Sequence, residues 1–405
     1  MFDLAIVGAG PTGGTLALTA ARLGLSVALI DARDLKKAQP RDTRNFAIVR
    51  GSWNLLSFSG LTEALSEHAE PLNGLEAVDG ARHWLGAPSA LFTGIDLPDT
   101  TGEPLLGYML EAEHLQAAID AAVTESEEIH RFAPALFTSM QVESGHVTVH
   151  LEKNKSLKTR LLVGSDGLNS PVRQAAGIGT EGRNYGKSVF AADVSLSRPH
   201  DGIARQLFTP EGPFATLPLA GNRANLAWYM KSGAAEALAE RPVEEINAEL
   251  NARFAEFAGE MAIDGPVKAY PLILQVATSM TGDRVALIGD AARRMNPLAG
   301  QGLNSGFKDV AALAEVCADQ MRAGLDPGDA LALERYQSWR RPDGLATALS
   351  MDLIDRVFSN DNALLKPLRG LALAMADRAP PLRTALARQA SAAQSYLPRL
   401  MQEPA

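Results

Sequence analysis

The chain has 405 residues, of which 46% are hydrophobic, and its 47 acidic and 38 basic side chains give a formal net charge of -9. This length provides core for two or three domains. The acidic balance argues against nucleic acid as a partner, because phosphate binding needs clustered Lys and Arg. The single cysteine, Cys317, excludes an internal disulfide and a multi-cysteine metal site, and we expect it to be a buried apolar residue in a helix.

The N-terminal segment predicts a β-α-β unit. Leu4–Val7 is a short apolar run typical of a buried parallel strand, and the helix-forming Thr15–Leu23 follows before Gly24. Ser26–Ile30 then predicts a second strand. Because these apolar residues belong to the unit and no basic segment precedes them, we expect no signal peptide. No apolar run approaches the roughly 18 residues of a spanning helix, so we expect a cytoplasmic protein.

The turn between that first strand and helix has the pattern GxGxxG. Gly8 permits the tight turn, Gly10 lets the backbone approach a pyrophosphate beside Pro11, and Gly13 allows close packing of helix on strand. Asp31 ends the next strand, where it would accept hydrogen bonds from an adenosine ribose. The turn therefore predicts a dinucleotide site, without distinguishing NAD from FAD.

The middle and the C-terminal part of the chain have different patterns. Short apolar runs split by Gly, Pro and Asn predict an antiparallel sheet between about Val189 and Leu274. From Asp309 onward the pattern is mostly helical, and we expect breaks at the prolines Pro327, Pro342, Pro367, Pro380 and Pro381.

The apolar run Leu161–Val163 leads into the motif GSDGLNSPVR. Ser170 followed by Pro171 predicts a helix start, with the serine as N-cap, so Asp166 lies in a strand-to-helix turn. From these residues alone, an ordinary turn without a ligand is an equally good interpretation.

The stretch GDAARRMNPLAGQG follows a predicted strand, Arg284–Ile288, and precedes a helix predicted from about Asn304 to Met321. Glycines at the start of a helix leave bare amides for an anion, and Asp290 at a strand end can bind polyol hydroxyls. FAD has a ribityl chain as well as a pyrophosphate. The stretch therefore favours FAD over NAD.

Taken in order, these three motifs resemble those of flavin-dependent aromatic hydroxylases of the para-hydroxybenzoate hydroxylase type, over nearly the whole chain. The segments DTRNFAI, NYGKSVF, PLAGQGLN, YQSWRRPD and FSND look like the ubiquinone-biosynthesis hydroxylase branch, which acts on polyprenylated phenols. The resemblance implies an α/β fold with a discontinuous Rossmann-like FAD-binding domain (1–75, 100–183 and 278–345). It also implies an antiparallel-sheet substrate domain (76–99 and 184–277) and a helical C-terminal region (346–405).

Carried over residue by residue, the resemblance implies that Arg44 lies along the cofactor, that Asp166 and Gly167 lie near the flavin and the nicotinamide donor, and that Asp290 bonds the ribityl chain. Pro297, Gly300 and Gln301 would form the catalytic environment of the flavin ring, with no side-chain base assigned. The full predicted cofactor set is Gly8, Gly10, Pro11, Gly13, Asp31, Arg44, Asp166, Gly289, Asp290, Pro297, Gly300, Gln301, Gly302 and Asn304.

The implied activity is hydroxylation of the phenol ring through a flavin hydroperoxide, because an electron-rich ring needs an electrophilic oxygen that no side chain supplies. The electron donor would be NAD(P)H, or a partner reductase or ferredoxin. Two alternatives stay open at this stage. One is a flavin oxidase or dehydrogenase of another aromatic substrate, and the other is a non-catalytic lipid-binding or scaffold member of a quinone-synthesis complex. A homo-oligomer is a further hypothesis.

Three features stand outside this pattern. Members of the family commonly have histidines where this chain has Arg293 and Asn296, so a histidine-based step cannot be assigned. The seven histidines are scattered, and His146 and His150 alternate with valines on one strand, which favours solvent exposure over a metal site. The tail 363–400 has six basic side chains against one acidic, which fits either a solvated helical face or peripheral contact with a membrane surface.

Overall fold

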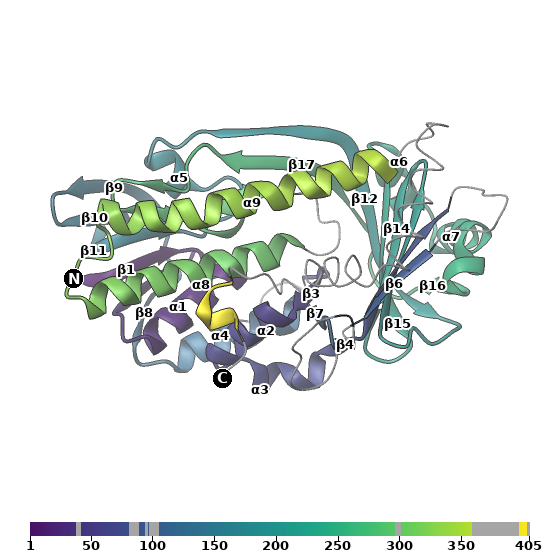
Figure 1. Cartoon of the computed structure of the whole chain (residues 1–405), viewed down its shortest axis with the longest axis horizontal. Helices are drawn as coiled ribbons and strands as arrows, with labels where there is room; N and C mark the ends of the chain where they lie inside the picture. The colour runs from purple at the N-terminus through teal and green to yellow at the C-terminus, as the bar shows by residue number, and fades with distance from the viewer. Residues whose placement is uncertain are drawn as a thin grey trace.

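The computed structural model describes residues 1–37, 42–80, 89–93, 96, 105–295, 301–358 and 397–402. In this part of the chain the elements form a large mixed sheet covered by helices, a second large sheet with its own helices, and a small sheet between them (Figure 1). Long helices α8 (Gln301–Arg322) and α9 (Ala330–Phe358) run alongside each other across the first body. This arrangement confirms the predicted α/β class.

The first sheet brings together strands from distant parts of the sequence. Its parallel centre has β1 (Phe2–Val7) between β2 (Val27–Ile30) and β11 (Lys155–Gly164). Further strands extend it on both sides: β8 (Ile129–Phe132), β9 (Phe137–Glu143), β10 (His146–Leu151), β18 (Thr281–Gly282) and β19 (Val285–Leu287). Because β2 and the last four residues of β1, Leu4–Val7, are apolar, both faces can be buried there, as in other parallel sheets.

Helices cover this sheet and share its core. Contacts of α1 (Pro11–Arg22) with α4 (Ala112–Glu125) and with α8 place these three helices together. Cys317 on α8 is fully buried, as predicted, and burial raises the pKa of its thiol to about 12. The predicted helices Thr15–Leu23 and Asn304–Met321 are confirmed as α1 and α8, each beginning a few residues earlier than expected.

The second sheet is antiparallel apart from one pairing. Its strand order is β20-β17-β12-β15-β14-β13-β5-β6, and β16 pairs with β12 outside this order. Among the described strands of this sheet, the one parallel pair is β13 with β5. The bounds are β20 (Arg293–Arg294), β17 (Lys268–Ala277), β12 (Thr180–Leu196), β15 (Arg223–Lys231), β14 (Gly212–Leu219), β13 (Ile203–Thr209), β5 (Gly74–Asp79), β6 (Ser89–Thr93) and β16 (Met261–Ile263). Helices α6 (Ala234–Ala239) and α7 (Val243–Ala258) pack against one face of this sheet and form with it a hydrophobic core separate from that of the first sheet.

The small sheet lies between these two bodies (Figure 1). In it, β3 (Asn45–Val49) and β4 (Glu70–Leu72) flank β7 (Gly107–Glu111). The short helices beside it are α2 (Arg50–Phe58) and α3 (Thr62–Leu65), and α5 (Pro171–Ala175) follows β11. The domain boundaries predicted above stay a prediction.

The C-terminal helical pattern differs from expectation at one residue. Pro342 lies inside α9 and does not break it. Most of the basic tail lies outside the described residues, as do Pro367, Pro380 and Pro381. Where the chain is described again, Arg399 pairs with Asp319 of α8 (Nη2 to Oδ1, 2.8 Å). Within the described ranges, no helix combines the length and the apolar character that crossing a bilayer requires.

Candidate functional site

The glycine turn between β1 and α1 has the shape that a phosphate needs. Gly8 has a φ of +102°, and a Cβ there would overlap the carbonyl oxygen of Ser165; a Cβ at Gly13 would overlap the carbonyl of Gly8. A Cβ at Gly10 would meet nothing within 4 Å, so this face of the turn is open. Gly10 is also the N-cap of α1, which has no side-chain cap and has Pro11 in its first turn. The amides of α1 therefore face open space, as an anion site requires.

Asp31 supports this turn from the end of β2. Its Oδ2 accepts a hydrogen bond from the Ala9 amide (2.6 Å) and its Oδ1 accepts one from the Arg33 amide (2.7 Å). Oδ1 accepts a second bond from Arg33 Nε (3.0 Å), so the remaining capacity for a ribose hydroxyl is at Oδ2. That ribose contact stays a prediction.

The turn after β11 packs directly against the glycine turn. Ser170 is the N-cap of α5 as predicted, because its Oγ accepts a hydrogen bond from the Arg173 amide (2.9 Å). Asp166 Oδ2 accepts one from the Val172 amide (3.0 Å). Its other oxygen, Oδ1, is buried without a hydrogen-bond partner among the described residues, and burial raises the pKa of the carboxyl. Ser165 and Gly167 of this turn line the pocket described below, and Asp166 does not; its place near the flavin stays a prediction.

The third turn begins at Gly289, directly after β19. Gly289 has a φ of +58°, and its amide donates a hydrogen bond to Asp309 Oδ2 of α8 (3.3 Å). Asp290 comes next and its side chain is accessible from the pocket. The protein around it raises the pKa of the Asp290 carboxyl by desolvation, against the positive charges of Arg294 and Arg44.

Two predicted cofactor residues lie where β3 meets α8. Arg44 lines the pocket, and its Nη2 is 2.6 Å from Asp42 Oδ2. Asn304 is fully buried, donating from Nδ2 to the Ala47 carbonyl (2.7 Å) and accepting at Oδ1 from the Val49 amide (3.1 Å). Asn304 therefore joins α8 to β3, and a direct cofactor contact from it stays a prediction.

The start of α8 is described only in part. Pro297 and Gly300 lie outside the described residues, as does Asn296, and Gln301 is described only by its place as the first residue of α8. Gly302 lines the pocket, and a Cβ there would meet nothing within 4 Å. The helix thus presents a bare backbone to the pocket near its N-terminus.

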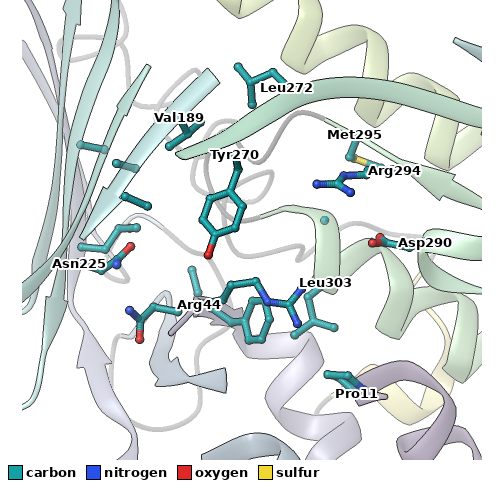
Figure 2. Close-up of a pocket in the computed structure, with 18 of the residues that line it drawn as sticks. Pro11, Arg44, Val189, Asn225, Tyr270, Leu272, Asp290, Arg294, Met295 and Leu303 are labelled. Atoms are coloured by element: carbon teal, nitrogen blue, oxygen red, sulfur yellow. The ribbon is translucent and has the colours of Figure 1, made fainter. Parts of the chain in front are cut away.

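These three turns border one pocket of about 460 Å³, whose opposite side is the second sheet (Figure 2). Figure 2 shows Asp290, Arg294 and Pro11 on one side, Val189 and Asn225 on the sheet side, and Tyr270 between them with its hydroxyl pointing toward Arg44. A volume in this range suits a small organic ligand. The glycines, the open amides and the two acidic turns fit FAD on the side of Pro11, and the sheet leaves an apolar surface opposite.

The sheet side of this pocket could not be predicted from the sequence motifs. Tyr270 and Asn225 line it, and neither stands in one of the three motifs. Their strands were predicted, but the face of a strand that meets a site depends on register, which the sequence of one strand does not fix. One local pattern was available in advance, namely alanines next to aromatic residues in several strands.

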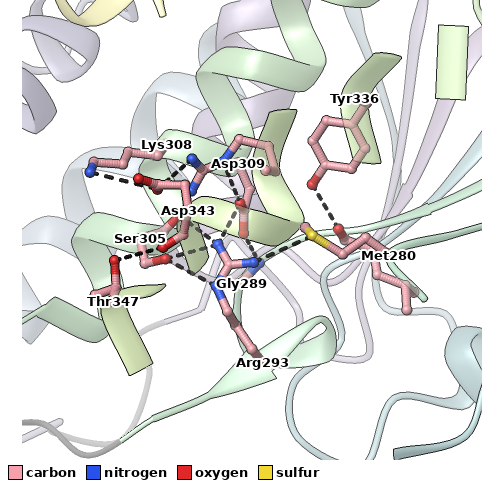
Figure 3. A network of polar contacts seen from close by, with 11 residues as sticks. Met280, Gly289, Arg293, Ser305, Lys308, Asp309, Tyr336, Asp343 and Thr347 are labelled. Atoms are coloured by element: carbon pink, nitrogen blue, oxygen red, sulfur yellow. Dashed lines mark hydrogen bonds and ion pairs between the residues drawn. The ribbon is translucent and has the colours of Figure 1, made fainter. Parts of the chain in front are cut away.

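Arg293 lies away from the pocket, in a buried ion cluster between α8 and α9 (Figure 3). Its Nη2 is 2.6 Å from Asp309 Oδ1, and Arg340 Nε of α9 is 2.9 Å from the same oxygen. Ser305 Oγ accepts a further hydrogen bond from Arg293 Nη2 (2.8 Å). Gly344 of α9 makes room for the guanidinium, because a Cβ there would lie 2.6 Å from Arg293 Nε. The residue that departs from the family pattern thus has a structural role.

The histidines give no support for a metal in the pocket. His146 and His150 are partly buried on β10 and not fully exposed as expected, and His146 Nε2 lies 3.4 Å from Glu143 Oε2. Ligand atoms of Glu111, Glu113 and His114 lie within 4.8 Å of one another, but none of these residues lines the large pocket. Acidic groups often cluster in this way without a metal, so the predicted lack of a metal site stays untested.

The chain has extensive similarity to known flavoproteins. Residues 1–348 match the family model described as FAD binding domain. The ubiquinone hydroxylase UbiL of Rhodospirillum rubrum is 38% identical over 390 residues, covering 96% of this chain and 89% of that protein. The 3-demethoxyubiquinol 3-hydroxylase of Escherichia coli is 32% identical, covering 94% of this chain and 96% of that protein.

A solved structure with the same overall fold is the p-nitrophenol 4-monooxygenase PnpA of Pseudomonas putida DLL-E4. It has a TM-score of 0.78 at 18% identity and covers 95% of this chain and 96% of that one. This likeness extends the fold assignment to both large sheets.

Proposed function

The chain belongs to the FAD-binding domain family, and from this premise we propose that it hydroxylates the aromatic ring of a polyprenylated phenol in ubiquinone biosynthesis. It is an FAD-dependent monooxygenase. The observation that carries the substrate assignment is the similarity, over nearly the whole chain, to the ubiquinone hydroxylases of Rhodospirillum rubrum and Escherichia coli. The pocket supports it, because the three cofactor turns face an apolar sheet surface across one cavity.

When bound and reduced, FAD activates dioxygen and supplies the electrophilic oxygen atom that an electron-rich ring requires. The protein holds the cofactor and excludes water. The open amides of α1 at Gly10 would bind the pyrophosphate, Asp31 the ribose, and Asp290 the ribityl hydroxyls. The N-terminal end of α8, at Gly302, would stabilise negative charge on the flavin ring through its dipole.

The side chains opposite the cofactor would hold the ring. Tyr270 and Asn225 are polar groups on a surface lined largely by Val, Leu, Ile and Ala, with Tyr229, Gln206 and Arg205 as further polar side chains, so they are suited to orient a phenolic hydroxyl. The apolar lining keeps water from the reacting atoms, which protects a reactive oxygen donor from loss. Arg44 lies between the two sides and, with its positive charge, would favour an ionised phenol.

The decisive experiment is incorporation of oxygen from labelled dioxygen. Purified protein with FAD, a reductant and a polyprenylated phenol should yield a product containing one labelled oxygen atom, detected by mass spectrometry. A flavin oxidase would release hydrogen peroxide and give an unlabelled ring. A non-catalytic scaffold would give neither, and a flavin-free variant would then restore quinone synthesis in a deletion strain.

We propose that the electron donor binds transiently, either as NAD(P)H against the flavin side of the pocket or as a reductase or ferredoxin partner. The chain has a single GxGxxG motif, so it offers no second nucleotide domain of that type. Stopped-flow reduction of the bound flavin by NADPH and by NADH separates these cases. Rapid reduction by one of them supports a direct donor, and slow reduction by both supports a protein partner.

We also propose peripheral contact with an anionic membrane surface through the basic tail. Of its six basic residues, Arg399 is already paired with acidic side chains of α8, so the contact would come from the other five. Flotation with anionic vesicles should be lost when these five are changed to Gln, and equal flotation of both proteins would contradict the proposal. The same gradients, run with cell extract, test for a quinone-synthesis complex, and light scattering tests for a homo-oligomer.

A further inference from the structure

Three neighbouring strands of the second sheet carry alanine at the same register on the face that lines the pocket. Ala191 of β12 lies opposite Ala227 of β15, and Ala227 lies opposite Ala215 of β14. All three line the pocket, and we call them the alanine row. On the next strand, β13, Gln206 lies opposite Ala215 and also lines the pocket.

The opposite face of the same strands has large aromatic side chains in place of alanines. The residues that precede or follow the alanines are Phe190, Trp228 and Phe214, which are fully buried and also stand in register with one another. They pack under α6 and α7. Alanine is disfavoured in strands, where larger side chains are more stabilising. Small residues at three paired positions on one face therefore keep a space open that the other face fills.

Larger side chains border the alanine row on both sides. Val189 and Tyr229 form one paired row, and Asn225 and Leu217 form the other. All four line the pocket as well. The surface is therefore a groove that crosses the strands, with alanine methyl groups at its floor. From β12 to β13 it spans three strand spacings, or about 14 Å.

The two ends of this groove differ. Next to β12 is β17, which carries Tyr270 and pairs with β20, the strand that holds Arg294 shortly after Asp290. This end is the flavin side of the pocket. Toward the other end, Ala204, Arg205 and Gln206 of β13 and Leu75 of β5 line the pocket, and no acidic side chain lines it there among the described residues.

We propose that the alanine row binds the polyprenyl tail of the substrate, with the aromatic ring at the Tyr270 end and the first prenyl units crossing β15 and β14 toward Gln206. The inference rests on the proposed function and deepens it. A branched hydrocarbon chain needs a narrow apolar groove and makes no hydrogen bonds, which is what the alanine floor and its walls provide. A ring alone would not need a groove that continues across three strands.

The test is a ladder of ligands carrying the same phenol head with no tail or with one, two or three prenyl units. Dissociation constants come from the change in the absorbance of the bound flavin in the holoenzyme, so no turnover is needed. In the unaltered protein we expect each added unit to tighten binding at least about tenfold until the groove is filled. Ala215→Leu should leave the affinity for the tailless phenol unchanged and remove the gain from added units.

If Ala215→Leu folds poorly, the smaller change Ala215→Val can be used in its place. We expect it to reduce in part the gain in affinity from each added prenyl unit. The matched control is Ala262→Leu on β16, where the alanine is exposed and does not line the pocket. It should keep the full ladder. An unaltered ladder in Ala215→Leu, or an equal loss for tailed and tailless phenols, would overturn the proposal. If tailless phenols are hydroxylated but added prenyl units do not tighten binding, only the proposed tail site is wrong. If added units do tighten binding but no phenol is hydroxylated, only the proposed function is wrong.

Discussion

Asp309→Asn tests the buried ion cluster with little change of shape. Asp309 is fully buried, and its Oδ1 lies 2.6 Å from Arg293 and 2.9 Å from Arg340, whose side chains are 4% and 2% exposed. Its Oδ2 also accepts the Gly289 amide (3.3 Å). The amide of asparagine is neutral and has one acceptor oxygen in place of two. The substitution therefore leaves two buried guanidinium groups without their shared counter-charge.

We expect Asp309→Asn to lower the free energy of unfolding by a large amount. Breaking a buried ion pair from one side destabilises a protein by about 3 to 5 kcal/mol. The lower end applies here, because Arg340 keeps Asp343 (2.7 Å) and Arg293 keeps Ser305 (2.8 Å). We therefore expect a loss of about 3 kcal/mol in the free energy of unfolding, or a fall of roughly 3 to 4 °C in Tm for a chain of this length. FAD affinity should also fall, since Gly289 precedes Asp290.

Urea unfolding gives the free energy, and fluorescence titration of the apoprotein gives the FAD affinity. The matched control is Glu211→Gln, which removes the exposed partner of Arg253 (2.9 Å) and should change stability by less than about 1 kcal/mol. We also expect Arg293→Met to be less destabilising in the Asp309→Asn background than in the unaltered protein, because in that background it removes an unpaired charge. A loss for Asp309→Asn no larger than that of the control would refute this reasoning.

The other predictions concern the glycine turn, Asp290 and Cys317. Gly10→Val should abolish FAD binding while reducing stability by less than about 1 kcal/mol, because its side chain enters open space; Gly13→Ala should destabilise the apoprotein by about 1 to 3 kcal/mol, because its Cβ overlaps the Gly8 carbonyl. Paired urea and FAD titrations check this, and equal stability of both variants would contradict it. Asp290→Ala should weaken FAD binding about 10- to 150-fold, the equivalent of a hydrogen bond to a charged group. Since desolvation by the surrounding protein raises the pKa of Asp290 and the ionised form is the better acceptor, FAD affinity should fall on acidification at a higher pH than for an aspartate of ordinary pKa, and Asp290→Asn should lack this step. The Cys317 thiol, with its pKa raised to about 12, should react with thiol reagents only as fast as the protein unfolds, and rapid labelling of the native protein would contradict its burial.

Local patterns predicted the elements whose stability is local. The strands at Leu4–Val7 and Ser26–Ile30 and the helix between them were confirmed to within a few residues, because apolar runs and glycines fix them. Pro342 shows the limit. A proline in a helix interior destabilises it by about 3 kcal/mol. On the N-terminal side of Pro342, however, α9 is anchored by Tyr336, whose hydroxyl donates to the Leu287 carbonyl (2.9 Å), and by Arg340, whose Nε is 2.9 Å from Asp309 Oδ1 of α8. Such contacts cannot be read from the helix sequence.

The candidate site divides in the same way. The turns at Gly8, Asp166 and Asp290 could be located because glycines, acids and helix starts stand next to each other in the sequence. The structure then brings all three turns to one region, with Gly8 packed on Ser165 and Gly289 on Thr12. Tyr270 and the alanine row could not be located, because they become a surface only when the four strands β17, β12, β15 and β14 pair in one register.

Arg293 and Asp290 are three residues apart, and the structure assigns them to opposite sides of one turn. Asp309 holds the turn from behind through Gly289 and Arg293, and the carboxylate of Asp290 faces the pocket. The turn is thereby fixed by partners on α8 and α9, and a histidine at 293 would have to sit in the cluster beside Arg340. Because Arg293 does not reach the pocket, proton transfer near the flavin cannot depend on that position. Among the described residues, Asp290 faces the pocket and its carboxyl can exchange a proton, so a pH-dependent step in catalysis should respond to a change at Asp290 and not at Arg293.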